Sequence, residues 1–296
     1  MIKDFEYFAP KTLQEALTLL DKYKDESKVI AGGQSLLILM RQGLVTPKYL
    51  IDIKGISGLN YIKSDAKEGL RIGALTTHRA IEKSPVIQRK CSVLAEMETR
   101  LASIQTRSWG TIGGNLCHGD PAGDLAPVLI ALNATLSTAS LKGKKNMAVE
   151  DFSLDYFETA LEPSELLTEI QIPVAPSHTG TAYTKFNVIE SDLATVGVAV
   201  SITLGSGDGV CQDIRVALGA TAPTAIRAKQ SEAVVKGKKI TDNLLQEAGE
   251  IASTEAEPIS DIYASEEYRR ELVKVLVKRV GKEALARAKQ DGGLIK

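Results

Sequence analysis

The chain has 296 residues, of which 44% are hydrophobic and 25% are charged, and this composition excludes a disordered or low-complexity protein. Thirty-six basic and 37 acidic side chains leave a formal net charge of -1, so nucleic acid is not the expected partner. At roughly one domain per 150 residues, the length predicts two domains.

The sequence shows no sign of export, membrane insertion or metal binding. Asp4 and Glu6 interrupt the start of the chain, where a signal peptide needs apolar residues, and the longest apolar run, around 196–204, is far shorter than a membrane span. The three cysteines lie far apart and lack the spacing of a zinc or iron–sulfur site. We therefore expect a cytoplasmic protein with no membrane partner and no metal held by this chain.

The first 175 residues alternate helical and strand patterns. Apolar spacing predicts a first α/β unit with a helix at 12–24, a strand at 28–31, a helix at 36–41 and a strand at 49–53. A second unit is predicted with strands at 59–63 and 70–72, helices at 79–83 and 93–104, a glycine-rich turn at 110–115, a helix at 124–132 and a strand at 165–172.

A segment rich in proline, serine and glycine at 173–180 predicts a linker. Beyond it, we expect three strands at 182–186, 194–204 and 211–218, with a hairpin turn at 205–209. The pattern becomes helical from Pro223 onward, most clearly at 266–288. The last part of the chain is therefore predicted to be a three-stranded sheet backed by helices.

Two segments with paired glycines are candidates for binding phosphate. Residues 31–35 (AGGQS) follow a predicted strand, and their glycines allow consecutive N–H groups to converge on an anion. Residues 110–115 (GTIGGN) add hydroxyl and amide side chains, so the two segments together could surround a diphosphate. The alternative for each is a tight turn without a ligand. Neither segment is a GxGxxG fingerprint or a P-loop.

Residues 118–124 (HGDPAGD) offer one imidazole and two carboxylates, which could indicate a metal or an acid/base pair. The more ordinary interpretation is a polar loop in which Asp124 is the N-cap of the helix that follows. A carboxylate at this place could also accept hydrogen bonds from a polyol.

The segments at 31–36, 110–115 and 120–124 occur in an order and spacing that resembles the FAD-binding medium subunit of molybdenum hydroxylases, the xanthine dehydrogenase and carbon monoxide dehydrogenase family. The likeness continues through Pro173, 185–196 and 217–227. It implies an α+β fold: a vanillyl-alcohol-oxidase (PCMH) type FAD-binding domain at 1–175, made of α/β subdomains at about 1–56 and 57–175, and a C-terminal domain at 178–290 with a three-stranded sheet and helices.

The resemblance implies that FAD is bound noncovalently by residues carried over from the family pattern. Residues 29–36 would wrap the diphosphate, 111–115 would complete the clasp, and Asp124 would bind the ribityl chain. The implied cofactor-binding residues are Val29, Ile30, Ala31, Gly32, Gly33, Gln34, Ser35, Leu36, Leu101, Ala102, Gly110, Thr111, Ile112, Gly113, Gly114, Asn115, Asp124, Leu167 and Lys185. No side chain of this chain is expected to be catalytic.

The family mechanism implies partners. A large molybdopterin-type subunit would hydroxylate the substrate, a small ferredoxin-like subunit with 2Fe-2S clusters would carry single electrons to the FAD, and a hydride would leave to NAD or NADP. Within the family, the chain most resembles separate flavoprotein subunits of bacterial enzymes that act on N-heteroaromatic compounds such as nicotinate or a purine, nicotinate dehydrogenase among them. Two alternatives stay open: a stand-alone flavin oxidase or reductase on the same scaffold, and a phosphate-binding module without redox function.

Overall fold

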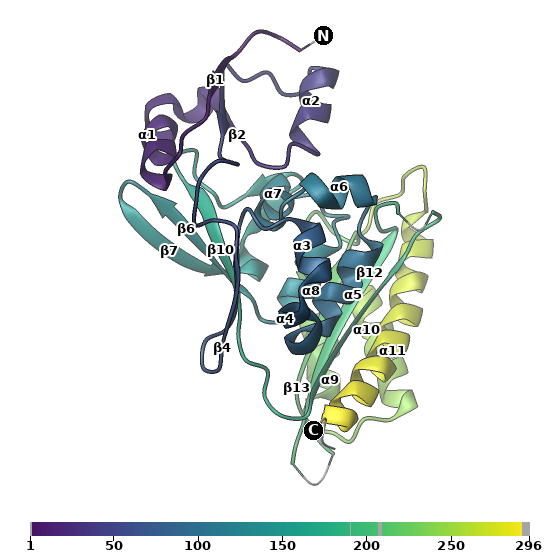
Figure 1. Ribbon diagram of the computed structural model, residues 1–296. Helices are drawn as coiled ribbons and strands as arrows, with labels where there is room; N and C mark the ends of the chain where they lie inside the picture. Colours follow the sequence, from purple (N-terminus) through teal and green to yellow (C-terminus); the bar gives the residue numbers. More distant parts are fainter. Residues whose placement is uncertain (1, 190, 207–208, 292–296) are drawn as a thin grey trace.

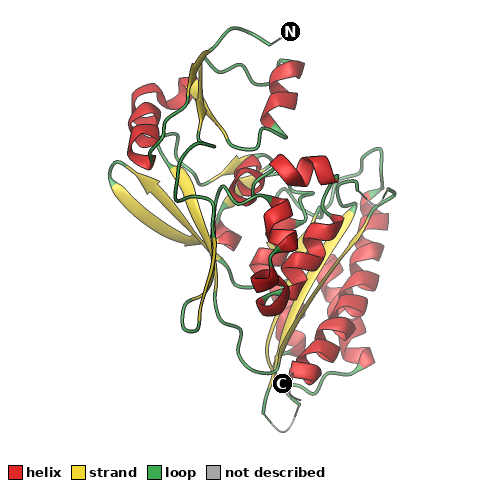
Figure 2. Ribbon diagram, in the orientation of Figure 1, coloured by secondary structure: helices red, strands yellow, loops and turns green. Residues whose placement is uncertain are grey.

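The structure, a computed structural model, describes residues 2–189, 191–206 and 209–291. Three regions follow one another along the chain, and each is built on its own main sheet (Figure 1, Figure 2). The first lies at the top of Figure 1, the second occupies the middle, and the third forms the lower right, with its long helices along one face of its sheet.

The first region is a small parallel α/β unit. Its strands pair in the order β1 (Glu6–Phe8), β3 (Tyr49–Asp52), β2 (Ser27–Ile30). The helix α1 (Leu13–Tyr23) packs Leu17 and Leu20 into the core, a 3-10 turn (Lys24–Glu26) leads to β2, and α2 (Leu36–Gln42) follows. The four elements predicted here are confirmed to within one residue at each end, and β1 is an additional strand.

The second region contains a five-stranded antiparallel sheet in the order β4 (Ile62–Asp65), β5 (Gly69–Gly73), β10 (Leu166–Ile172), β6 (Thr135–Ser140), β7 (Gly143–Ala148). Its helices are α3 (His78–Lys83), α4 (Pro85–Lys90), α5 (Ser92–Arg100), α6 (Ile104–Trp109), α7 (Ile112–His118) and α8 (Leu125–Ala131). A 3-10 turn (Val149–Asp151) and the short pair β8 (Ser153–Asp155) and β9 (Glu158–Thr159) complete it.

Three predictions for this region need correction. The strand predicted at 59–63 begins only at Ile62. The single helix predicted at 93–104 is two helices, because Ala102 adopts a left-handed conformation with φ 44° and ends the first of them. The glycine-rich turn predicted at 110–115 is helical from Ile112 onward, since the Thr111 side chain accepts a hydrogen bond from Gly114 N (3.1 Å) and caps α7.

The third region is an antiparallel sheet of four strands, β11 (Thr179–Phe186), β12 (Val196–Leu204), β13 (Cys211–Gly219) and β14 (Ile226–Arg227). The prediction of three strands is wrong because residues 226–227, expected to be helical, pair with the end of β13. The predicted turn at 205–209 includes 207–208, which lie outside the described residues.

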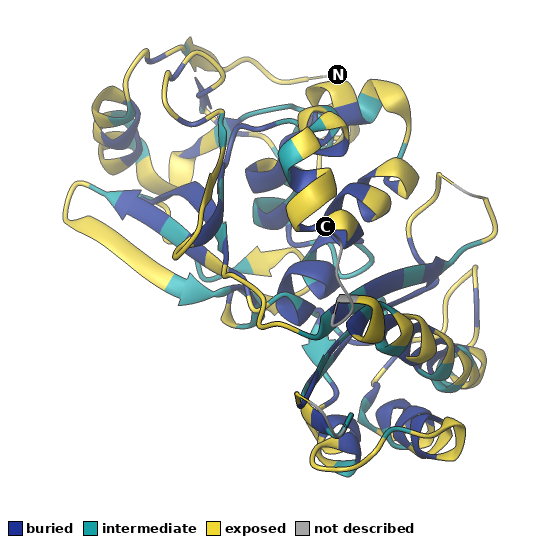
Figure 3. Ribbon diagram, turned by 60° about the horizontal axis from the view of Figure 1, so that its bottom comes forward, coloured by how far each residue is buried: buried dark blue, intermediate teal, exposed yellow. Residues whose placement is uncertain are grey.

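Three helices, α9 (Lys229–Val235), α10 (Asp242–Glu255) and α11 (Glu266–Asp291), cover one face of this sheet. Figure 3 shows their outer sides exposed and their sheet-facing sides buried. A Cβ at Gly180 would overlap the backbone of α11, so β11 and α11 approach closely. The opposite face of the sheet packs on α5 and α8 of the second region. In the described part of the chain, no helix has the length and apolar character needed to span a bilayer.

Candidate functional site

The segment between β2 and α2 presents a row of backbone donors. Gly33 has φ +72°, which turns the chain sharply after Ile30. In the described residues, the amide N–H groups of residues 32–36 have no hydrogen-bond acceptor, while Gly32 O accepts a bond from Gln34 Nε2 (3.1 Å). Such a row of unpaired amides with little side-chain bulk suits an anion such as phosphate.

The backbone at Trp109 and Gly110 forms the opposite wall. A Cβ at Gly32 would overlap the Trp109 carbonyl oxygen and lie 2.7 Å from Gly110 Cα. A Cβ at Gly114 would lie 3.8 Å from Ala31 Cβ. The structure therefore brings the two glycine segments together from two different regions, and Gly32 is the residue that permits their approach.

The second glycine segment differs from the expected second phosphate nest, because its amides are already bonded. The acceptors at the start of α7 are Thr76 O for Ile112 N (3.0 Å), Ala74 O for Gly113 N (2.9 Å) and Thr111 Oγ1 for Gly114 N (3.1 Å). The Asn115 backbone N–H is bonded as well, to Thr111 O (2.9 Å). This segment therefore offers a ligand a surface without a side chain at Gly114, and the side-chain amide of Asn115, which has no hydrogen-bond partner in the described residues.

Asp124 is buried and occupies the predicted N-cap position of α8, but its side chain makes no capping bond there. Its Oδ1 accepts a hydrogen bond from Tyr183 Oη (2.6 Å) and its Oδ2 from Lys185 Nζ (2.7 Å). Burial raises the pKa of Asp124, and the Lys185 ammonium opposes that effect. Two residues that the family pattern places at the cofactor, Asp124 and Lys185, thus form one ion pair across the second and third regions.

Lys185 also donates to the Asp192 carbonyl (2.8 Å) and so reaches the loop after β11. Sequence reasoning missed Tyr183, although it lies two residues before Lys185 on one strand and therefore points to the same face.

The other polar residues of the 118–124 loop are not gathered around a metal position. The His118 ring packs on Phe157 with a centroid distance of 5.2 Å, and burial lowers the pKa of His118. Asp120 accepts a hydrogen bond from Ala122 N (2.9 Å). In the described ranges, no group of three or more His, Cys, Asp or Glu side chains is placed to hold a metal ion.

The break at Leu101 and Ala102 is held by a buried arginine. Arg107 Nη1 donates to the carbonyls of Leu101 (2.8 Å) and Ala102 (2.7 Å), and its Nε donates to Glu82 (3.1 Å). Burial opposes ionisation of Glu82, but Arg79, Lys83 and Arg107 outweigh it and lower the pKa of Glu82. Sequence reasoning missed this pair, since nothing local connects residues 25 positions apart.

A buried His78–Glu98 pair lies behind Gly110. His78 N donates to Gly110 O (3.0 Å), and His78 Nδ1 lies 3.0 Å from both oxygens of Glu98. Both side chains are buried, and burial raises the pKa of Glu98, which His78 partly offsets. The pair therefore supports the wall of the candidate site from within the core.

The remaining predicted residues are apolar and supply packing. Val29 and Ile30 belong to β2, and Ile30 packs on Met40 and Leu50. Leu36 begins α2. Leu167 is a buried residue of β10 in the core that includes α7.

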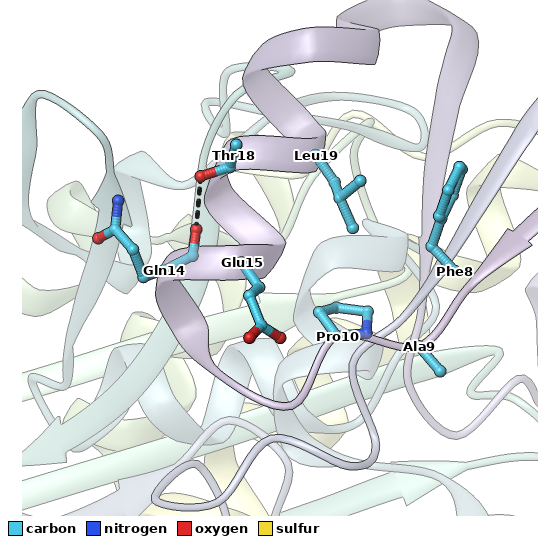
Figure 4. Close-up of a pocket in the computed structure, with 7 residues that line it drawn as sticks. All are labelled: Phe8, Ala9, Pro10, Gln14, Glu15, Thr18 and Leu19. Carbon is cyan, nitrogen blue, oxygen red and sulfur yellow. Dashed lines mark hydrogen bonds between the residues drawn. The ribbon is translucent and has the colours of Figure 1, made fainter.

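A separate hollow lies between the end of β1 and α1 (Figure 4). Phe8, Pro10, Glu15 and Leu19 are among its lining residues, and Thr18 donates to Gln14 O (2.9 Å) beside it. None of the predicted cofactor residues lines this hollow, so it is not part of the candidate site.

Comparisons with known proteins give consistent results over the whole chain. Residues 3–175 match the family described as "FAD binding domain in molybdopterin dehydrogenase", and residues 181–284 match "CO dehydrogenase flavoprotein C-terminal domain". The medium chain of glyceraldehyde dehydrogenase from Sulfolobus acidocaldarius is 35% identical over 95% of this chain and 98% of its own length.

The nicotinate dehydrogenase FAD-subunit of Eubacterium barkeri is 32% identical over 94% of this chain and 95% of its own length. A solved structure of carbon monoxide dehydrogenase from Hydrogenophaga pseudoflava superposes with a TM-score of 0.93 at 36% identity and covers 97% of this chain and 99% of the other.

Proposed function

Because this chain belongs to the family of FAD-binding subunits of the xanthine dehydrogenase and carbon monoxide dehydrogenase type, we propose that it carries electrons from an N-heteroaromatic substrate of its complex to NAD or NADP. The chain contains the FAD-binding domain of a molybdenum hydroxylase. The observation that carries the proposal is the row of unpaired amides at residues 32–36, which faces a second glycine segment.

The residues present fit an FAD diphosphate. The amides of 32–36 would donate to its oxygens, and Gly32 and Gly114 leave room for close approach. Asp124 would accept hydrogen bonds from the ribityl hydroxyls with lone pairs that Tyr183 and Lys185 leave available. Leu101, Ala102, Leu167 and Lys185 keep their predicted roles at the cofactor, and 1–175 and 178–290 stay the proposed domain boundaries.

When bound, FAD would supply the chemistry that accepts single electrons from iron–sulfur clusters and transfers a hydride to a nicotinamide. This chain binds and orients the cofactor and excludes water from it, and none of its side chains has to act as a nucleophile. We expect noncovalent binding, because the Cys117–His118 dipeptide at the end of α7 forms no attachment motif that we recognise.

We propose a large molybdopterin-type subunit and a small 2Fe-2S subunit as partners, in the cytoplasm. Nicotinate dehydrogenase, one of the relatives, supports a heteroaromatic substrate. Relatives named for glyceraldehyde and carbon monoxide are 35% identical, against 32% for the nicotinate dehydrogenase subunit, so similarity does not follow substrate class, which is expected if another subunit binds the substrate. The alternatives are a self-contained flavin oxidase or reductase and a phosphate-binding module without redox function.

The test uses the purified full chain. Flavin absorption bands should be present, and acid precipitation should release the FAD into the supernatant. NADH or NADPH should reduce the flavin under anaerobic conditions, and an artificial acceptor should then sustain turnover. A flavin that neither nucleotide reduces would refute the proposed electron acceptor, and rapid oxidation of nicotinate or a purine by the chain alone would favour the self-contained oxidase.

A further inference from the structure

The third region forms hydrogen bonds with the loop that joins α7 to α8. This loop, residues 119–124, ends in the buried Asp124 carboxylate. Its contacts with the third region are Ala220 N to Pro121 O (2.8 Å), Ala194 N to Ala122 O (3.4 Å), Tyr183 Oη to Asp124 (2.6 Å) and Lys185 Nζ to Asp124 (2.7 Å). Two of these contacts come from backbone amides, so they hold only while the backbone around Ala194 and Ala220 keeps its position.

A single arginine fixes both of those backbone segments. Arg269, near the start of α11, is 5% exposed. Its Nη1 donates to Thr195 O and to Ala220 O (3.2 Å), and its Nη2 donates to Asp261 Oδ2 (2.6 Å). Thr195 directly follows Ala194, and Ala220 supplies the second amide itself. One planar guanidinium therefore fixes the backbone next to both amides that bond to the loop.

The backbone at Ala220 shows that this position needs support. Ala220 has φ 60°, a left-handed conformation that is strained for a residue with a Cβ. Such strained residues persist where their surroundings determine them, and here the surroundings are the Pro121 carbonyl on one side and the Arg269 guanidinium on the other.

We propose that Arg269 is a positioning residue for the cofactor: through Thr195 and Ala220 it holds the 119–124 loop, and with it the Asp124 carboxylate, in the place where FAD is bound. This inference rests on the proposed role of Asp124 at the ribityl chain. Asp261 neutralises the charge of Arg269, so the effect of Arg269 on the cofactor is geometric rather than a direct field.

The same helix provides a matched control. Arg287, near the other end of α11, donates to Thr181 O (3.0 Å), to Glu96 (2.7 Å) and to Glu283 (2.6 Å). It therefore also ties α11 to β11 and to α5 of the second region, but it makes no contact with the 119–124 loop. A variant at Arg287 weakens the packing of α11 but leaves the hydrogen bonds of Arg269 with Thr195 O and Ala220 O in place.

The experiment compares Arg269→Gln with Arg287→Gln in the full chain, by FAD titration of the apoprotein and by thermal unfolding. Arg269→Gln should weaken FAD binding at least about fivefold, the lower end of typical couplings between sites. Arg287→Gln should lower the unfolding temperature but change FAD affinity by less than about twofold, as expected for distant independent sites. Equal losses of FAD affinity in the two variants, or no loss in Arg269→Gln, would overturn the inference.

Asp261→Asn keeps the inference testable if Arg269→Gln does not fold. Asp261 Oδ1 accepts hydrogen bonds from Tyr263 N (2.9 Å) and Ala264 N (3.0 Å), while Oδ2 accepts one from Arg269 (2.6 Å). Asparagine has a single acceptor oxygen for both sets of donors, so this variant loosens the position of Arg269 without removing its guanidinium. It should weaken FAD binding by less than Arg269→Gln, and an affinity equal to that of the wild type would count against the inference. Reduction of the wild-type flavin by NADH and NADPH is measured in parallel. Its failure would refute the proposed acceptor while the comparison of FAD affinities still stands.

Discussion

The two glycine segments have similar compositions and different structures. At residues 32–36 the backbone donors have no acceptor in the described residues, whereas at 112–114 they bond to Ala74, Thr76 and Thr111 within the second region. The first segment can therefore bind an anion through its backbone N–H groups. The backbone of the second has no free N–H group at 112–114, and its glycines only leave room for the anion. Paired glycines thus mark places where backbone must come close, and the acceptors around them decide whether a ligand or the protein itself fills the space.

The largest effect is expected from Gly32→Val. Its Cβ would overlap Trp109 O and lie 2.7 Å from Gly110 Cα, and neither backbone atom can move aside without separating the two segments. We expect purified protein without FAD, measured as the ratio of flavin to protein absorbance.

Gly43→Ala is the matched control for Gly32→Val. Gly43 ends α2 with φ +76° and has open space around its Cβ position. The alanine should cost about 1–2 kcal/mol of strain and leave FAD bound. If Gly32→Val also kept its FAD, the two segments would not form a common site.

Gly113→Ala should separate stability from cofactor binding. Its Cβ would lie 2.7 Å from Ala74 Cβ and Ala74 O, so overpacking should lower the free energy of unfolding by about 1–3 kcal/mol. Urea unfolding measures this loss, and the folded fraction should still bind FAD.

Gly114→Ala, one residue further along α7, should do the reverse. Its Cβ would lie 2.9 Å from Thr111 Oγ1 and would face Ala31 across the candidate site, so FAD affinity should fall. The higher helix propensity of alanine, about 1 kcal/mol, should offset part of the loss of folding stability. Unchanged FAD affinity would show that the second segment does not approach the cofactor.

Glu98→Gln should make stability less dependent on pH. Burial raises the pKa of Glu98 above its ordinary value of 4.5, and the charged groups that act on it are His78, Asp124 and Arg107. A carboxyl with a raised pKa stabilises the fold below its unfolded value and loses that contribution as pH rises through the folded pKa. The wild type should therefore lose more unfolding free energy than the glutamine variant from pH about 4 to 8. Parallel curves would show that the pKa of Glu98 is not raised in the folded protein.

The smallest effect is expected at Cys117, one helical turn after Gly113 and on the same core-facing side of α7. Burial raises the pKa of Cys117 to about 12, so its thiol is largely un-ionised at pH 8. Labelling with a thiol reagent should be slow in the native protein, with FAD or after its removal, and complete in denaturant. Faster labelling after FAD removal would show that α7 opens when the cofactor leaves.

Periodicity predicted most of the elements that bury one clear face, although β6 was missed, and it also missed elements that bury none. The strand β7 carries Lys144, Lys145 and Asn146 and is largely exposed, so its sequence has no apolar alternation. The strands β1 and β14 are only three and two residues long. The break between α5 and α6 falls on Ala102 rather than on a glycine, and therefore the local sequence gives no signal for it.

The candidate site was predictable to the extent that glycine marks a close approach of backbone. Which amides stay unpaired was not predictable, because the acceptors for α7 come from Ala74 and Thr76, in the segment that follows β5. The partners Tyr183, Glu82 and Arg107 were missed for the same reason, since each bond joins residues that only the tertiary fold brings together.

The position of β10 in the five-stranded sheet has a consequence for synthesis of the chain. This strand lies between β5 and β6, yet it is the last strand of the second region to be translated. Until Ile172 has left the ribosome, β4–β5 and β6–β7 are two separate hairpins without their common neighbour, and isolated hairpins are marginal in water. The apolar face that β5 and β6 will share with Ile170 stays open during that interval, so this stretch of the nascent chain is the one most in need of protection from aggregation.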